Sequence, residues 1–157
     1  ATECFSGGKN EKPSLLFCTS LLSIILISCS SKSVKFDAED IKISIINVDY
    51  IDDYKTYSVE IKNNGRIDLF FVDLFLSYPI KQKNGWKGNP YKVEGKTEAG
   101  KPINIQPEQT TYFTIIAPIK EVFGDSDLLE IDHPYLELYG YTRNGGNYIP
   151  FGKTIGL

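Results

Sequence analysis

The feature that most constrains the fold of this sequence is a period-two alternation of apolar and polar residues, repeated in short segments. Ile41, Ile43 and Ile45 alternate with polar residues, and the apolar positions then continue on the opposite parity at 46–50. Because successive side chains of a β-strand point to opposite faces, the alternation predicts a half-buried strand, and the change of parity predicts a β-bulge. After residue 40 the chain has no long segment with a helical period. This part is therefore expected to form β-sheets.

Similar segments follow at short intervals along the chain. Asp52-Asp53 predicts a turn, and the alternating segment after it ends at Asn63-Asn64-Gly65-Arg66, a pattern typical of a hairpin. The most apolar stretch, 67–78, predicts a central strand. Further strand-like segments lie near 91–93, 103–105, 110–116, 134–141 and from 148 onwards, with a polar loop at 84–88 and a helical turn at 119–123. Pro150 lacks a backbone donor, which places the last strand at a sheet edge.

Spacing and composition together predict the fold class. The strand-like segments predict an all-β fold, an antiparallel immunoglobulin-like β-sandwich of about seven or eight strands, over residues 41–157. The chain has 157 residues, of which 41% are hydrophobic and 13% aromatic, enough apolar material for one core. The net charge of −3 makes nucleic acid a poor partner. We expect this domain to be a monomer.

The N-terminal region has the layout of an export signal. An uncharged run of fifteen residues extends from Ser14 to Ser28, and Lys9 and Lys12 precede it. A helix needs about 20 apolar residues to span a bilayer, so the run is short for a transmembrane segment. It predicts an N-terminal signal helix, and residues 1–28 are assigned to upstream residues and a signal peptide.

Leu26-Ile27-Ser28-Cys29, at the end of this run, resembles the lipobox of bacterial lipoproteins. The resemblance implies that the thiol of Cys29 receives a diacylglyceryl group and that a signal peptidase cuts between Ser28 and Cys29. It also implies acylation of the new amino terminus, and more than one acyl chain makes membrane anchoring stable. Residues 29–40 would then be the lipidated cysteine and a tether. The domain would lie outside the cytoplasm, lipid-anchored in the bacterial cell envelope.

Two segments of the domain resemble a second family. Residues 59–64 run into Val72-Asp73-Leu74-Phe75-Leu76-Ser77-Tyr78, and Ile105-Gln106-Pro107-Glu108-Gln109-Thr110 follows later. They are similar to immunoglobulin-like domains of bacterial lipoproteins, of the FxLYD type or the water-stress (LEA-like) type. These families are mostly binding or structural modules, so the resemblance implies a fold and no catalytic residues.

The polar residues of the chain predict no catalytic or metal site. His133 is the single histidine, and a serine or cysteine triad would have to use it. Zinc would lack a second histidine and a free cysteine. The acidic segment 125–132 offers oxygen ligands, but its spacing departs from that of an EF-hand, so a solvated loop is preferred over a calcium site. We expect no enzymatic activity, no cofactor and no metal.

Two aromatic features are candidates for binding. Trp86 lies among the lysines of 81–101 and is either a core plug or an exposed anchor. These lysines either protect sheet edges or face anionic lipid or a partner. Tyr135, Tyr139 and Tyr141 share one parity of a strand while Leu136 and Leu138 share the other, so the tyrosines are expected to face outward. They form a partner site or serve only as cross-strand packing.

Three functions are compatible with these features. The preferred hypothesis is a non-catalytic extracytoplasmic module that binds a protein or envelope polymer while anchored to the membrane through lipid on Cys29. The first alternative is a carbohydrate-binding or adhesive surface protein, which an exposed aromatic platform would favour. The second is a small cell-envelope hydrolase, which a deep pocket with paired carboxylates would favour.

Overall fold

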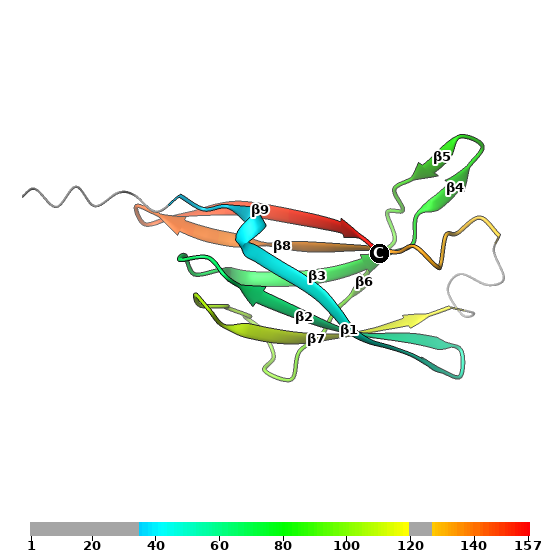
Figure 1. The fold of residues 1–157 in the computed structure, drawn as a ribbon, viewed down its shortest axis with the longest axis horizontal. Helices are drawn as coiled ribbons and strands as arrows, with labels where there is room; N and C mark the ends of the chain where they lie inside the picture. The colour runs from blue at the N-terminus through cyan, green and yellow to red at the C-terminus, as the bar shows by residue number, and fades with distance from the viewer. Residues whose placement is uncertain (1–34, 120–126) are drawn as a thin grey trace, which may run out of the picture. The chain divides into compact units, whose positions relative to one another are not determined.

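The alternating segments of the sequence form strands that pair antiparallel (Figure 1). The computed structural model describes residues 35–119 and 127–157. One sheet has the strand order β1-β2-β7, and a second has the order β6-β3-β8-β9. These strands are β1 (Ile41–Ile51), β2 (Tyr54–Asn63), β3 (Phe70–Ser77), β6 (Val93–Glu94), β7 (Thr110–Pro118), β8 (Tyr135–Asn144) and β9 (Asn147–Gly156).

The strand order is that of an immunoglobulin-like sandwich. β1 and β2 form a hairpin around the turn at Asp52-Asp53, and the chain then crosses from β2 to β3 in the other sheet. It returns to the first sheet only with β7, which pairs with β2. The arrangement corresponds to strands A-B-E facing strands C′-C-F-G. The predicted all-β antiparallel sandwich is confirmed. At Asn63-Asn64-Gly65-Arg66 the chain forms no hairpin and crosses between the sheets instead, because β2 and β3 belong to different sheets.

The inner faces of the two sheets form the core. Their buried side chains include Tyr57, Val59, Ile61, Phe113 and Ile115 in one sheet and Val72, Leu74, Leu76, Leu136 and Leu138 in the other. The Tyr57 and Tyr78 hydroxyls lie 3.1 Å apart in this core. Burial raises the pKa of Tyr78 to about 12, and it also raises the pKa of Tyr57. Both phenols are therefore neutral at physiological pH, and one can donate to the other.

Two local predictions about the strands are also confirmed. The register between β1 and β2 shifts between Ile45 and Asn47, which is the expected bulge, and it leaves Ile46 exposed. Pro150 lies in β9, at the edge of the four-stranded sheet, where no further strand needs its backbone donor.

Residues 80–87 form a hairpin and not the polar loop expected at 84–88. β4 (Ile80–Gln82) pairs with β5 (Gly85–Lys87), and the hairpin projects from one end of the sandwich (Figure 1). Gly85 has a φ of 117°, a conformation that favours glycine in a tight turn. Backbone hydrogen bonds from Lys81 to Leu128 and from Glu130 to Pro79 hold the base of the hairpin.

Part of the predicted tether packs on the sandwich. A 3-10 helix, η1 (Ala38–Asp40), precedes β1, and Asp37 caps it by accepting from the Glu39 amide. The Phe36 and Phe151 rings lie 5.0 Å apart, and Lys153 Nζ donates to the carbonyl of Ala38 at 3.0 Å. Phe36 supplies the apolar surface for this packing, so ordered structure begins before Ile41.

Several expectations lie outside the described residues. They are the signal helix, Ser28, Cys29, Asp125 and most of the helical turn at 119–123. Within the described ranges, none of the helices has the length and hydropathy needed to span a membrane.

Candidate functional site on the outer face of the four-stranded sheet

The tyrosines of β8 point away from the core, as their parity predicted. Leu136 and Leu138 are fully buried, while Tyr139 and Tyr141 are each 41% exposed. Tyr135 is half-buried because it lies against Gly156 of β9, where an added Cβ would come within 3.1 Å of its ring. The outer face of the four-stranded sheet therefore carries a row of tyrosines along β8. Their role in binding stays a prediction.

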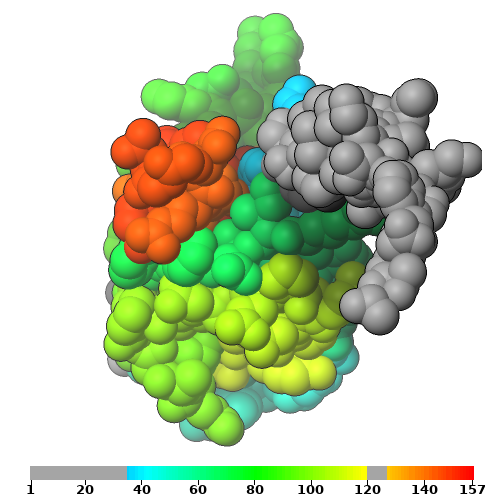
Figure 2. Space-filling view, turned by 90° about the vertical axis from the view of Figure 1, so that its left-hand side faces the viewer, coloured from blue at the N-terminus to red at the C-terminus, as the bar shows by residue number. Residues whose placement is uncertain are grey.

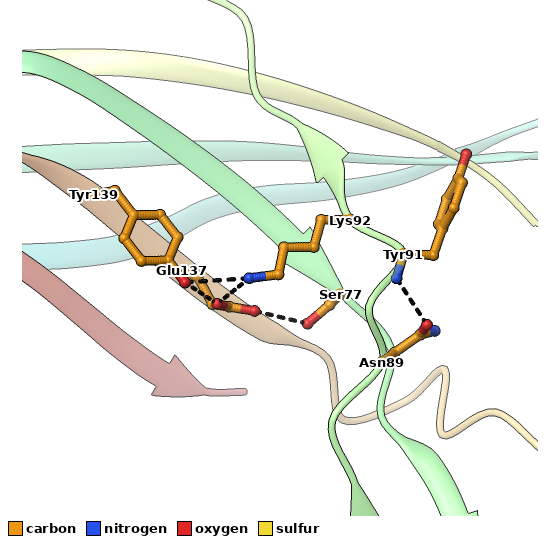
Figure 3. A network of polar contacts seen from close by, with 6 residues as sticks. All are labelled: Ser77, Asn89, Tyr91, Lys92, Glu137 and Tyr139. Atoms are coloured by element: carbon orange, nitrogen blue, oxygen red, sulfur yellow. Dashed lines mark hydrogen bonds and ion pairs between the residues drawn. The ribbon is translucent and has the colours of Figure 1, made fainter.

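Glu137 is the centre of a polar network on this face (Figure 3). Its Oε2 atom lies 2.5 Å from Lys92 Nζ, and the Tyr139 hydroxyl donates to the same oxygen. Ser77 Oγ donates to the other carboxylate oxygen at 3.2 Å. The network arises because β3 pairs with both β8 and β6, which brings Ser77 beside Glu137 and the segment before β6 over Tyr139.

The network favours a charged carboxylate. Burial raises the pKa of Glu137, but hydrogen bonds from Lys92, Tyr139 and Ser77 outweigh burial and hold this pKa below its ordinary value. The hydrogen bonds of Lys92 to Glu137 and Tyr139 raise the pKa of the lysine. At neutral pH the two groups form an ion pair, so Glu137 is poorly suited to act as a general acid.

An open groove runs beside this network. It has a volume of about 600 Å³, and its lining includes Ser77, Lys87, Asn89, Tyr135, Glu137 and Thr154. Asn89 Nδ2 donates to the carbonyl of Tyr78 at 2.9 Å. The Tyr91 amide donates to Asn89 Oδ1 at 3.0 Å (Figure 3). These bonds fix the segment that forms one wall. The groove thus presents hydroxyl, amide and charged groups on a fixed frame.

Trp86 is exposed, so the core-plug alternative is wrong. Its side chain is 57% exposed on β5, and it stacks on His133 with ring centroids 6.2 Å apart at 22°. His133 Nδ1 lies 3.2 Å from Glu130 Oε1. Trp86 is part of the projecting hairpin, and its neighbour Lys87 lines the groove. The structure therefore places Tyr135 in the lining of the groove, Tyr139 against the lining residues Glu137 and Lys92, and Trp86 next to the groove.

Tyr141 belongs to a different cluster at the far end of the same face. We call the rings of Phe70, Phe71, Tyr141 and Tyr148 the aromatic tip. Tyr148 contacts the other three edge-on, with centroid distances of 5.6, 5.4 and 6.2 Å. Phe71, Tyr141 and Tyr148 are 44%, 41% and 45% exposed. Arg143 lies over the Tyr148 ring at 5.4 Å.

A β-bulge in β3 creates the aromatic tip. The register between β3 and β8 shifts between Phe70 and Asp73, and Phe71 has a φ of 52°. The bulge allows two consecutive phenylalanines to reach the outer face, because both rings contact Tyr148. A bulky residue in the left-handed region costs free energy on the order of 1–3 kcal/mol, and such strain often marks functional sites.

The sequence hypothesis missed most members of both clusters. Strict alternation placed Phe70 with the buried residues of its strand, and nothing in a phenylalanine indicates a positive φ. The pairing of strands that are distant in sequence brings the other members into the clusters, namely Tyr148, Lys92 and Glu137. A doubled aromatic at the start of an apolar strand was the one available signal for a bulge.

Other charged groups on the sheet are also paired. Lys101 Nζ lies 2.5 Å from Asp73 Oδ1 and also contacts Glu94. These hydrogen bonds raise the pKa of Lys101. Among the residues that the structure describes, no three His, Cys, Asp or Glu side chains are placed to share a metal ion.

Comparisons with known proteins give low similarity. No protein-family model and no curated protein matches the sequence. Spo0M, a sporulation control protein from Bacillus subtilis, is 16% identical with a TM-score of 0.40, covering 75% of this chain and 47% of Spo0M. This chain therefore spans about half the length of Spo0M.

Two other solved structures are similar at the same level. A protein from Archaeoglobus fulgidus is 10% identical with a TM-score of 0.37, covering 80% of this chain and 96% of that protein. Northeast Structural Genomics Consortium target SoR45 is 16% identical with a TM-score of 0.32, covering 74% and 82%. These values are too low to transfer a function.

Proposed function

We propose that this chain is a lipid-anchored extracytoplasmic module of the bacterial envelope, which binds a protein or envelope polymer in the groove beside Glu137 and performs no catalysis. The anchor rests on the order of lysines, uncharged run, Ser28 and Cys29 in the sequence. The binding role rests on one observation: a groove of ion-paired and hydroxyl-bearing side chains stands open on a rigid sheet.

Rigidity of the groove supports a binding role. Tyr139 is restrained by its bond to Glu137 and by Lys92, whose Nζ lies 5.2 Å from its ring centroid. Little conformational entropy is lost when a partner covers a side chain that is already restrained. Tyrosine also combines a large apolar surface with a polar hydroxyl, which is why it is enriched at binding surfaces. The groove and the adjoining Tyr139 therefore supply preorganised contacts.

A glycan is the partner polymer that the lining favours most. Tyr135, Thr154 and Ser77 provide hydroxyls, and Glu137 and Lys92 provide charged acceptor and donor groups for sugar hydroxyls. Exposed tyrosine rings can stack on the apolar faces of sugars. This chemistry supports the carbohydrate-binding alternative, while the paired state of Glu137 gives the hydrolase alternative no support.

The anchor is tested by Cys29→Ser. The thiol is the expected acyl acceptor, so the variant should accumulate as an uncleaved precursor and lose labelling by a fatty-acid analogue. Ser28→Ala keeps a small residue before the cysteine and is the matched control that should still be labelled. Continued labelling of Cys29→Ser would refute the anchor.

The groove is tested by photo-crosslinking in cells. A benzophenone amino acid replaces exposed Thr154 in the groove or, as a control, Tyr112, which is 57% exposed on the outer face of the three-stranded sheet. Crosslinks at 154 that are absent at 112, and that Glu137→Ala weakens, are expected. Sedimentation with purified peptidoglycan then separates a glycan from a protein partner. Equal crosslinking at both positions would overturn the groove as the site.

A further inference from the structure

The aromatic tip lies at the end of the sandwich where the described chain begins. Lys35 and Phe36 line a small cavity with Gly65, Arg66 and Ile67 of the loop between β2 and β3. That loop leads directly into Phe70, the first residue of β3. Figure 2 looks onto this end, with the β8–β9 turn in orange facing the viewer. The chain's entry point and the aromatic tip therefore share one end of the domain.

The distance between this end and the lipid is limited by chain length. Six residue steps lead from Cys29 to Lys35, and a fully extended chain of that length spans at most about 22 Å. The limit holds whatever conformation the segment adopts. Phe36 is fixed against Phe151, which lies three residues after Tyr148 on β9 and hence about 10 Å along the strand. Lipid on Cys29 would keep the aromatic tip close to the membrane.

The groove lies toward the other end of the sheet. Ser77, which lines the groove, is the last residue of β3, whereas Phe70 and Phe71 are the first two. Seven residue steps along a strand correspond to about 23 Å. The β4–β5 hairpin, which contains Trp86, follows beyond Ser77. The two clusters of the outer face are therefore separated along the strand direction, and only one of them lies at the tether end.

The chemistry of the aromatic tip suits a membrane interface. Tyrosine rings with exposed hydroxyls favour the boundary between headgroups and acyl chains, and phenylalanine adds apolar surface. Arg143 over Tyr148 and the exposed Arg66 at this end can contact lipid phosphates while their stems stay on the apolar side. Asp68 and Asp40 are also exposed here, so the apolar contacts and not the net charge carry the interaction.

We propose that the aromatic tip docks on the surface of the same membrane that holds the lipid on Cys29. The inference rests on the proposed anchoring. Docking at the tip orients the domain: the β8–β9 end lies against the lipid, and the groove and Trp86 face away from it, toward the envelope. The strained backbone at Phe71 is then explained, because the bulge is what brings the second phenylalanine to the lipid-facing surface.

The test uses a membrane anchor that does not depend on cellular processing. Cys29 is the single cysteine in the chain from Cys29 to Leu157, so a maleimide lipid attaches this part to vesicles at the natural position. The buried core lies entirely within residues 41–138, so this part retains it. Vesicles contain phosphatidylglycerol and phosphatidylcholine, with or without brominated acyl chains that quench tryptophan at the interface.

Three reporter variants in a Trp86→Phe background read the orientation. Tyr148→Trp and, independently, Tyr141→Trp report on the tip, and Tyr112→Trp reports on the outer face of the other sheet. Brominated lipid should quench the two tip reporters several-fold more strongly than the Tyr112→Trp reporter, with a blue shift of their emission. Equal quenching at all three positions, or none at the tip, would overturn the proposal.

Failure of this proposal is distinguishable from failure of the anchor. If the Cys29→Ser variant is still labelled by the fatty-acid analogue in cells, the lipid anchor is refuted. This holds even where the tip reporters are quenched on chemically lipidated protein. If labelling depends on Cys29 but the tip reporters are not quenched, the anchor holds and membrane docking at the tip is refuted. Two reporters at the tip guard against a variant that fails to fold, which a thermal melt of each identifies.

Discussion

The two ends of the outer face of the four-stranded sheet use tyrosine in opposite ways. At the groove end, the Tyr139 hydroxyl donates to Glu137, and Lys92 Nζ lies over the Tyr139 ring. Two residues further along β8, Tyr141 contacts Phe71 and Tyr148 edge-on in the aromatic tip. Both tyrosines are equally exposed. The comparison shows that exposure does not distinguish them, whereas their partners do: one end presents organised polar groups, and the other presents apolar rings.

The largest expected difference in stability between the two ends comes from substitution of a glycine in β8 and of a glycine in β9. A Cβ on Gly140, beneath the aromatic tip, would lie 2.8 Å from Phe151 and 3.2 Å from the carbonyl of Phe70. A Cβ on Gly152, beside Tyr139, would meet ring atoms only at 3.4 Å. Gly140→Ala should therefore destabilise the domain by about 1–3 kcal/mol, and Gly152→Ala should change its stability by less than about 0.5 kcal/mol. Urea unfolding of both measures this, and equal effects would contradict the tight packing at Gly140.

Removal of the charge on Glu137 should have the next largest effect. Glu137→Gln weakens bonds to Lys92, Tyr139 and Ser77, and at pH 7 it should cost about 1–2 kcal/mol. The pKa of Glu137 is lowered in the fold, so its contribution is present above about pH 4.3, its ordinary value, and disappears as the pH falls through the lowered folded pKa. The raised pKa of Lys92 keeps the pair intact up to alkaline pH.

Thermal melts of wild type and Glu137→Gln between pH 2 and pH 9 check this linkage, a range that brackets ordinary carboxylate titration. The two melting curves should differ at neutral pH and converge in acid. A difference in stability that does not change with pH would show that the variant acts through packing and not through the charge.

The hydroxyls of the two tyrosines give a smaller and sharper comparison. Tyr139→Phe loses a bond to a charged group and should cost about 0.5–1 kcal/mol, reduced by the exposure of the site. Tyr141→Phe keeps its ring contacts and should change stability by less than about 0.3 kcal/mol. Matched unfolding curves decide this. A larger cost at Tyr141 would mean that its hydroxyl and not its ring holds the aromatic tip together.

The exposed ion pairs of Lys101 should matter least. Lys101→Met removes contacts to Asp73 and Glu94, but its side chain is 55% exposed, so the cost should be below about 1 kcal/mol. Salt at about 1 M should erase most of it, since the Debye length falls to roughly 3 Å. Unfolding at low and high salt measures the effect, and a cost that is large and insensitive to salt would assign Lys101 a structural role.

Local sequence patterns predicted much of the fold. The bulge near Ile46, the outward tyrosines of β8 and the edge position of β9 follow from the parity of side chains and from Pro150. β4 and β5 were not predicted because each has only three residues, and their pairing depends on the backbone conformation of Gly85. The packing of Phe36 was not predicted, because a single apolar residue in a polar segment forms no periodic pattern.

The candidate site was harder to predict than the fold. Its contacts join residues far apart in sequence, such as Lys92 with Glu137 and Phe70 with Tyr148. Such contacts depend on the register of paired strands, which a single sequence specifies only through the buried face. The outer face imposes no comparable constraint, so the sequence predicted which β8 side chains face outward but not which groups meet there.

Hydrogen exchange on the lipid-anchored chain tests the central claim, that one end of this sheet face meets the membrane and the other remains open. Exchange is compared between the chain from Cys29 to Leu157 anchored on vesicles and the same chain free in solution. We predict slower exchange on vesicles for the amides of the β8–β9 turn and of the Phe71 bulge, with no change in the β4–β5 hairpin. Protection of the β4–β5 hairpin, with unchanged exchange at the aromatic tip, would contradict the claim.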